Sequence, residues 1–372
     1  MRRGAELTVL HISTPATWRG GEQQLAYLID ELPEIKHLVL TPPESRLAQH
    51  CVACGHVWLP LQQRGMLARV FQLKRAVRKY KADLVHIHDA KAHTLAYVAT
   101  LLGMRARLIV SRRVDFPIKQ NPLSFRKYTH PAVKRIAAVS YAIADIICEQ
   151  LPVRDRTTVI HSGVDTARFA NKKNQGRLRY DWDVPTDHWL IGNTSAVADH
   201  KDYRTFVDTA AYVQAQGLRA TFFIIGDGPE SASIQQYIIA QGMNAIVFMT
   251  GFREDITDLI VELDLFLMTS KTEGLGTSVL DAFAAEVPVV ATQAGGIPEM
   301  VRHTETGLLA PVGQPQALGE ALLQLIQEPE LRRKLVSNAS EAVKAFSKEK
   351  MAARTKALYQ SVLAEPAVIN QR

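Results

Sequence analysis

The order of predicted elements indicates an α/β protein with two doubly wound parallel sheets. Two series of short runs rich in β-branched residues alternate with stretches of helical spacing, as in parallel sheets covered by helices on both faces. With 372 residues, the chain is also longer than one ordinary core needs. We therefore expect a domain at 1–168, a linker or surface excursion at 169–187, a second domain at 188–346 and a closing helix and tail at 347–372.

The first series predicts strands at 7–12, 37–40, 56–59, 84–87, 107–110 and 136–139. Helices between them include 22–32, 66–81 and 91–102. The second series predicts strands at 189–193, 221–225, 246–249, 265–268 and 287–291. The polar stretch between the two series is typical of a linker.

Composition is that of a globular protein, with 47% hydrophobic and 22% charged residues. No run approaches the roughly 18 apolar residues of a spanning helix, and 7–12 is too short for a signal peptide, so we expect a cytoplasmic protein. Cys51-x-x-Cys54 with His56 nearby could suggest a metal. No second pair completes the ligand set, so reduced thiols and no metal are expected.

Charge is unevenly distributed along the chain. Residues 1–179 hold 29 Lys and Arg against 13 Asp and Glu, whereas residues 180–372 hold 15 against 24. The basic first domain is therefore expected to attract an anionic membrane surface, at the inner face of the cell membrane. The alternative is a solvated helix face, because the cluster at 69–81 surrounds an ordinary apolar stripe. Nucleic acid is not expected, since no binding module accompanies the charge.

The segment 272–292, TEGLGTSVLDAFAAEVPVVAT, is the most informative for function. Its glycines allow the backbone to approach a ligand closely, and the N–H groups that open the helix predicted at 278–286 are unpaired donors. Such a turn suits a phosphate or a polyhydroxyl group. Glu273 is expected at the helix start, and Asp281 can project a carboxylate toward a diol.

With these residues the chain resembles the retaining glycosyltransferases of family 4, which combine an E-x7-E element with a strand and a G-G-x-P-E loop, here 295–299. Further matching segments follow in family order: Gly20-Gly21-Glu22, 83–88, 159–165, Gly226-Asp227-Gly228-Pro229 and 306–309. The second glutamate is Asp281 here, shorter by one methylene. The resemblance implies the GT-B fold, in which two Rossmann-like domains face each other across a cleft and a C-terminal helix crosses back to the first.

The resemblance also implies a nucleoside-diphosphate sugar as donor, with UDP, ADP or GDP open, and Glu273 and Lys201 as catalytic residues. Relatives hold the diphosphate with an arginine and, five residues later, a lysine. Lys201 matches the lysine, but Ala196 replaces the arginine, so Arg253 or Arg113 is the expected substitute. The residues expected at the donor are Gly20, Gly21, Lys201, Gly226, Asp227, Arg253, Glu273, Gly274, Leu275, Gly276, Thr277, Asp281 and Glu299.

The acceptor or sugar side is expected to involve His88, Arg112 and Arg113. His86 and His88 share one face of a strand, so they are either a core pair or groups that face the cleft. His88 lies nearer the strand end and is the better candidate. Relatives often carry a histidine just after the next strand, where this chain has Ser111-Arg112-Arg113.

The implied reaction retains the anomeric configuration and needs no cofactor. Lys201 and the helix-start amides would take the role that a divalent ion plays elsewhere. The expected acceptor is a carbohydrate or lipid-linked molecule of bacterial cell-surface polysaccharide, lipopolysaccharide or glycolipid synthesis. Two alternatives stay open: a UDP-sugar 2-epimerase of the same architecture, and a degenerate, non-catalytic binding protein at the membrane, which Ala196 and Asp281 favour.

Overall fold

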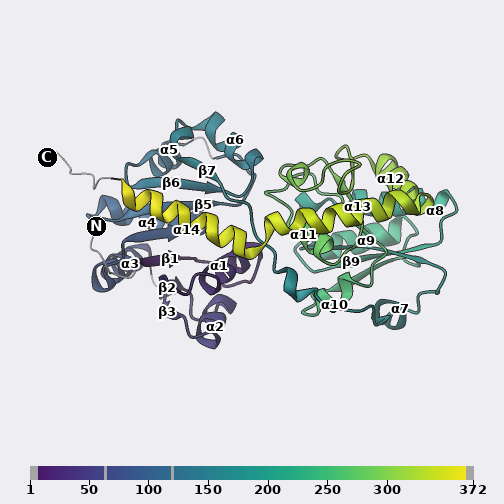
Figure 1. Cartoon of the computed structure of the whole chain (residues 1–372), viewed down its shortest axis with the longest axis horizontal. Helices are drawn as coiled ribbons and strands as arrows, with labels where there is room; N and C mark the ends of the chain where they lie inside the picture. The colour runs from purple at the N-terminus through teal and green to yellow at the C-terminus, as the bar shows by residue number, and fades with distance from the viewer. Residues whose placement is uncertain (1–6, 63–64, 119–120, 366–372) are drawn as a thin grey trace. The chain divides into compact units, whose positions relative to one another are not determined.

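The computed structural model describes residues 7–62, 65–118 and 121–365. The chain forms two compact α/β units, one made of Met1–Gly163 with Lys348–Arg372 and the other of Val164–Ser347 (Figure 1). Two doubly wound units, with a C-terminal helix that returns to the first, confirm the fold that the sequence predicts. The chain leaves the first unit after Gly163, earlier than the boundary expected at 168.

In the described part of the first unit, a seven-stranded parallel sheet has the order β3-β2-β1-β4-β5-β6-β7. Its strands are β1 (Thr8–Ile12), β2 (Lys36–Thr41), β3 (Val57–Pro60), β4 (Leu84–Ile87), β5 (Arg107–Arg112), β6 (Val133–Ala138) and β7 (Thr157–Val159). The strand order reverses between β1 and β4, which pair directly. Ligands of open α/β sheets bind beyond the carboxyl ends of the strands at such a switch point.

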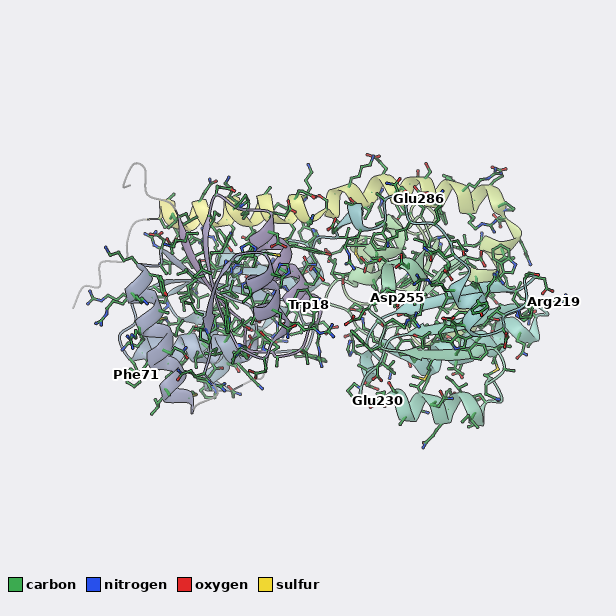
Figure 2. The ribbon with its side chains drawn as sticks, turned by 90° about the horizontal axis from the view of Figure 1, so that it is seen from below. Trp18, Phe71, Arg219, Glu230, Asp255 and Glu286 are labelled. Carbon is green, nitrogen blue, oxygen red and sulfur yellow. The ribbon has the colours of Figure 1, made fainter. Side chains whose placement is uncertain are left out.

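The helices that cover this sheet are α1 (Gly20–Asp30), α2 (Arg46–Ala53), α3 (Met66–Tyr80), α4 (Ala90–Leu101), α5 (Pro122–Thr129), α6 (Tyr141–Gln150) and α14 (Lys348–Ala364), with a 3-10 turn η1 (Arg154–Arg156). α14 lies along the first unit (Figure 1). It belongs to this core, because Met351, Leu358 and Tyr359 are buried in one cluster with Val9 and Leu84. α3 keeps an outer face exposed to solvent, on which Phe71 lies (Figure 2).

The second unit, as described, has a six-stranded parallel sheet of order β10-β9-β8-β11-β12-β13. Its strands are β8 (Trp189–Thr194), β9 (Ala220–Ile225), β10 (Val247–Gly251), β11 (Leu265–Met268), β12 (Val289–Thr292) and β13 (Leu308–Ala310). Both faces are buried, since Phe222, Phe223 and Ile224 are all inaccessible to solvent. The order reverses between β8 and β11, which places a second switch point there.

The second unit contains helices α7 (Arg177–Asp181), α8 (Tyr203–Ala215), α9 (Ser231–Ala240), α10 (Ile256–Ile260), α11 (Thr277–Ala284), α12 (Pro315–Gln327) and α13 (Pro329–Ala342). Its 3-10 turns are η2 (Thr166–Arg168), η3 (Asp199–Lys201), η4 (Ile297–Glu299) and η5 (Val343–Phe346). None of the helices described in either unit combines the length and apolar character needed to cross a membrane.

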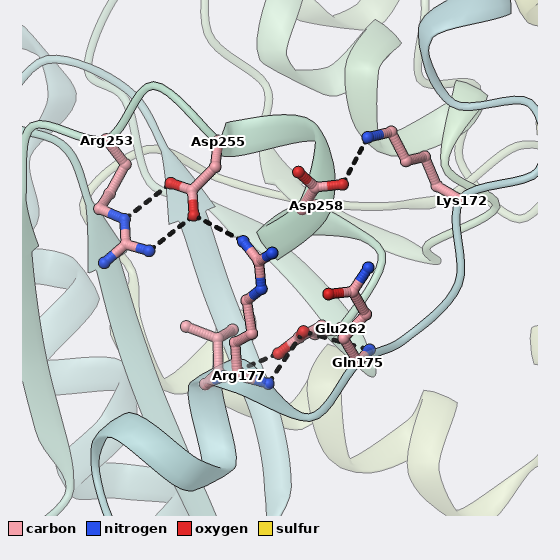
Figure 3. A network of polar contacts seen from close by, with 8 residues as sticks. Lys172, Gln175, Arg177, Arg253, Asp255, Asp258 and Glu262 are labelled. Carbon is pink, nitrogen blue, oxygen red and sulfur yellow. Dashed lines mark hydrogen bonds and ion pairs between the residues drawn. The ribbon is translucent and has the colours of Figure 1, made fainter.

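The segment expected as a linker or surface excursion, 169–187, is bound to the second unit. The buried Glu262 carboxylate accepts backbone N–H groups of Gln175, Arg177 and Leu178 at 3.3, 3.0 and 2.7 Å (Figure 3). Three charge-assisted hydrogen bonds hold this polar stretch in place. It is therefore an excursion on the surface of one unit.

Candidate functional site

Lys201 and Glu273 meet at the carboxyl ends of the strands in the second unit. Lys201 ends η3, in the loop after β8, and Glu273 lies in the loop between β11 and α11. Lys201 Nζ contacts Glu273 Oε1, and the same oxygen accepts a hydrogen bond of 2.9 Å from Ser270 Oγ. The two side chains are only 14% and 9% exposed. The structure therefore brings the two expected catalytic residues together as a largely buried ion pair.

The loops that carry this pair are tied to each other. Thr269 Oγ1, just beyond β11, contacts the carbonyl oxygens of Lys201 and Asp202 at 3.0 and 3.1 Å. The N–H of Lys271 donates to the carbonyl of His200 at 2.8 Å. Because these contacts fix the backbone on both sides, the lysine and the glutamate are held in register with little freedom to separate.

Gly295 is required by close packing against the backbone of Glu273. It has φ +50°, and a Cβ at this position would lie 2.0 Å from the Glu273 carbonyl oxygen. The N–H of Gly296 donates to that oxygen at 3.1 Å. The G-G-x-P-E loop therefore supports Glu273 through the main chain. Glu299, at the end of η4, lies in the same loop cluster.

Close approach also explains the glycines at 226 and 228. A Cβ on Gly226 would lie 2.0 Å from the Ser195 carbonyl oxygen, and one on Gly228 would lie 2.2 Å from that of Val197. The carboxylate of Asp227, between them, accepts hydrogen bonds from Ser231 Oγ and from the N–H of Gly228. These bonds lower the pKa of Asp227. Its carboxylate thus fixes the start of α9, and the segment packs against the loop that leads to Lys201.

Helix α11 begins at Thr277, after Gly274, Leu275 and the N-cap residue Gly276, whose φ of +91° favours glycine. Asp281, in its second turn, is partly buried, and its carboxylate makes no hydrogen bond or ion pair within the described residues. Burial raises the pKa of Asp281 to about 6, although Arg168 opposes this shift. This carboxylate is therefore available to accept hydrogen bonds from a ligand's hydroxyl groups.

Arg253 is engaged within the second unit. Its guanidinium donates to both oxygens of Asp255 at 2.8 and 2.7 Å, and Arg177 donates to the same carboxylate at 3.1 Å (Figure 3). Arg253 therefore shares the Asp255 carboxylate with Arg177 in this structure, and its expected role as the substitute for the missing arginine stays a prediction. Ala196 is exposed and contributes no cation.

In the first unit, three expected residues come together at the switch point. α1 begins at Gly20, and a Cβ on Gly21 would lie 4.0 Å from Arg113 Cδ. Arg113 in turn lies 3.4 Å from His88 Nδ1. Burial lowers the pKa of Arg113 to about 10, opposed mainly by Glu22. Arg112 points elsewhere, toward Tyr128 Oη at 3.4 Å and the carbonyl of Phe116.

His88 begins a chain of buried histidines, of which the sequence indicated only part. His88 Nε2 lies 3.0 Å from His11 Nδ1, and His11 Nε2 lies 2.9 Å from His37 Nδ1. His37 Nε2 lies 3.1 Å from the carbonyl of Leu32, which can only accept. Each ring therefore donates through Nε2, and Arg113 donates to His88. Burial lowers the pKa of all three imidazoles, for His37 to about 4, so they stay neutral at pH 7.

His86 completes this cluster with bonds of its own, to Tyr359 Oη at 2.6 Å and Ser111 Oγ at 2.8 Å. His11, His86 and His88 are close enough to hold a metal ion. Every ring nitrogen of the three, however, already has a partner, and Arg113 adds a positive charge beside them. The donor set therefore fits a hydrogen-bonded core. His11 could have been found from the strand register, which pairs it with His86.

Comparison with known proteins agrees with this geometry. The model described as "Glycosyltransferase Family 4" matches residues 18–168, and the model described as "Glycosyl transferases group 1" matches residues 174–342. N-acetyl-alpha-D-glucosaminyl L-malate synthase of Bacillus anthracis is 24% identical over 304 residues, which cover 80% of this chain and 79% of the relative. The lipopolysaccharide core biosynthesis glycosyltransferase LpsE of Rhizobium meliloti is 25% identical over 296 residues, which cover 79% of this chain and 80% of the relative.

Among solved structures, Anabaena HepE in complex with UDP-glucose is similar over 96% of this chain and 100% of that chain. The TM-score is 0.85 and the sequence identity is 20%. At this identity the likeness concerns the fold alone.

Proposed function

The chain belongs to the family 4 glycosyltransferases with the GT-B fold, and on this premise we propose that it moves a sugar from a nucleoside-diphosphate donor to an acceptor with retained anomeric configuration. The observation that carries the proposal is the buried Lys201–Glu273 pair beside the glycine-rich start of α11. A cation and helix-start N–H groups suit a diphosphate leaving group. A carboxylate and the nearby Asp281 suit the hydroxyl groups of a sugar and a ribose.

Each residue has a distinct part in the proposed reaction. Lys201 and the N–H groups of α11 neutralise the charge that develops on the departing diphosphate. Glu273 orients the sugar ring and stabilises positive charge at its anomeric carbon. The acceptor hydroxyl attacks the face that the phosphate leaves, and the leaving phosphate takes the hydroxyl proton. This scheme needs no catalytic metal, because Lys201 and the amides take the Lewis-acid role.

A screen of nucleotides tests the donor class. UDP, ADP, GDP and their glucose and N-acetylglucosamine conjugates are titrated by calorimetry and thermal shift, with UDP first because Anabaena HepE was solved with UDP-glucose. One nucleotide at 100 times its dissociation constant should stabilise the protein by about 2.7 kcal/mol. No binding of any nucleotide would support the non-catalytic alternative, which the exposed Ala196 and the engaged Arg253 keep open.

Product analysis separates transfer from epimerisation. With UDP-N-acetylglucosamine and no acceptor, a transferase should release sugar and UDP slowly, whereas a 2-epimerase should form the epimeric nucleotide sugar. The anomeric configuration of the released or transferred sugar, followed by NMR, tests retention. Inversion would contradict the proposed face of attack.

We also propose that the first unit docks on an anionic membrane, where a lipid-linked acceptor of cell-surface glycan synthesis would be found. Leu67, Phe71, Arg75 and Arg78 repeat at helical spacing along α3, and all four are exposed. An apolar and basic helix face of this kind suits a lipid interface. The basic residues in and after α5 are less suitable, because Lys127 is buried and Arg135 pairs with Glu365.

Arg75→Glu with Arg78→Glu should reduce co-sedimentation with phosphatidylglycerol vesicles and leave nucleotide binding unchanged. The loss should be largest at low salt, since the Debye length falls from about 10 Å at 0.1 M to about 3 Å at 1 M. The matched control reverses Arg333 and Lys334, which are exposed on α13 of the second unit. Equal binding of the wild type to anionic and neutral vesicles would refute membrane docking.

A further inference from the structure

Three metal-ligating side chains meet at the amino-terminal edge of the first sheet, the edge opposite His88 and Arg113. Asp30 ends α1, His50 lies in the last turn of α2, and His56 directly precedes β3. The Asp30 carboxylate lies 3.0 Å from His50 Nε2 and 2.6 Å from His56 Nε2. One ligand atom from each residue lies within 4.8 Å of the other two.

A helix-ending motif brings the two histidines to the same place. Gly55 has φ +74°, and its N–H donates to the carbonyl of Val52 while the N–H of His56 donates to that of Cys51 at 2.8 Å. This pair of bonds is the Schellman motif, in which a left-handed residue reverses the chain at the helix end. His56 therefore turns back beside His50, so that both Nε2 atoms face Asp30.

The donor set fits a late first-row divalent ion. Imidazole nitrogens and a carboxylate oxygen bind Zn²⁺ at about 2.0–2.1 Å, which puts tetrahedral donors about 3.3 Å apart. The present separations from the carboxylate, 2.6 to 3.1 Å, need to open by only tenths of an ångström. Cys54 Sγ lies 3.9 Å from His50 Nδ1, the nitrogen that faces away from Asp30, and so restrains the ring.

The surroundings favour a cation at this position. The carboxyl ends of α1 and α2, where the helix dipoles are negative, both lie at the cluster. The side chains of His50, His56 and Asp30 are 24%, 19% and 31% exposed, so water can reach the site and complete the coordination. The buried His11, His86 and His88 differ, because all their ring nitrogens are occupied.

We propose that Asp30, His50 and His56 bind a divalent transition-metal ion, with Zn²⁺ as the best fit, and that this ion joins α1, α2 and the edge strand β3. The role is structural, because the site lies at the edge of the sheet away from the switch point. The sequence predicts no metal here, since Cys51-x-x-Cys54 lacks a second pair. The missing ligand, Asp30, comes from another helix twenty residues before His50.

Metal binding is tested on the full chain after treatment with EDTA. Titration with Zn²⁺ should show one equivalent bound and a higher melting temperature. Co²⁺ should give the visible absorption of a low-symmetry nitrogen and oxygen site, without the charge-transfer band of a thiolate ligand. His50→Ala, His56→Ala and Asp30→Asn should each weaken Zn²⁺ binding at least ~10-fold, as loss of even an outer-sphere partner does.

His188→Ala is the matched control, because His188 lies in the second unit and bonds Thr221. It should bind Zn²⁺ like the wild type. Each variant is first compared with the wild type by melting in EDTA, and Asp30→Asn keeps the shape of the site should an alanine variant fail to fold. Undiminished Zn²⁺ uptake in Asp30→Asn and His56→Ala, or no uptake by the wild type, would overturn the proposal.

Discussion

The two units place opposite kinds of polar group at equivalent positions of the same architecture. At the switch point of the first unit, neutral histidines form a hydrogen-bonded chain that runs from Arg113 to the carbonyl of Leu32. At that of the second, Lys201 and Glu273 form an ion pair held by glycine-rich loops. A chain of buried neutral histidines opposes protonation, whereas a partly buried acid such as Asp281 opposes loss of its proton. The folding stability contributed by these groups should therefore change with pH in opposite directions in the two units.

Acid should produce the largest difference between the units. His11, His37 and His88 have pKa values below that of a free imidazole, so the stability that they contribute above pH 6.5 is lost as pH falls. His37 alone, with a pKa of about 4, accounts for ~3 kcal/mol. Glu22, whose pKa burial raises, opposes this within the same unit. Hydrogen exchange between pH 7 and 4.5 should show the first unit opening first; earlier opening of the second would contradict the comparison.

Lys201→Ala tests the ion pair at the switch point of the second unit. It leaves Glu273 buried without its cation, which costs about 3 kcal/mol of folding stability, and it should weaken binding of nucleoside diphosphate and lower the rate together. The control is Lys271→Ala, a nearby lysine that is 43% exposed. Urea unfolding and calorimetry measure the two effects. Unchanged affinity for UDP, ADP and GDP would remove Lys201 from the donor site.

Glu273→Gln keeps the shape of the site and removes its charge. Turnover should fall at least ~100-fold, about 2.7 kcal/mol of transition-state stabilisation, while nucleotide binding stays near the wild-type value. Glu286→Gln, on the exposed turn after α11, serves as the control. Steady-state kinetics with the preferred donor provide the measurement, and wild-type turnover in Glu273→Gln would exclude a catalytic role.

Asp281→Asn should have the smallest effect on folding stability. The pH dependence that it removes is opposite in sign to that of the histidines. The folded-state pKa of about 6 lies above the ordinary value of 3.8, so the wild type loses stability as pH rises through 6. Because the carboxyl group stays partly exposed, we expect Asp281→Asn to gain about 1–2 kcal/mol at pH 8 and nothing near pH 4. Denaturant titrations at both pH values check this, with Asp199→Asn as the exposed control.

Much of the fold could be predicted from the local pattern of apolar residues. The eleven strands predicted from apolar runs are present, whereas β7 and β13, three residues each, are too short to show a period. In the second unit the resemblance to family 4 implied both Lys201 and Glu273 as site residues, and the glycines beside them mark where backbones must approach.

The histidine chain and the Asp30 cluster could not be predicted in the same way. His11, His37 and His88 come from three strand regions, and only the lateral order of those strands makes them neighbours. The same holds for Arg253, whose engagement with Asp255 depends on a side-chain rotamer that spacing does not reveal. Interactions set by tertiary proximity leave no periodic signal in the chain.

The return of α14 to the first unit has a consequence for the order in which the protein is made. Tyr359, wholly buried and bonded to His86, follows every residue of the second unit in the chain. The core of the first unit thus stays open until α14 has been synthesised, while the contiguous second unit, Val164–Ser347, has all its residues earlier. We expect stalled nascent chains ending near residue 347 to protect the second unit from protease and leave the first exposed.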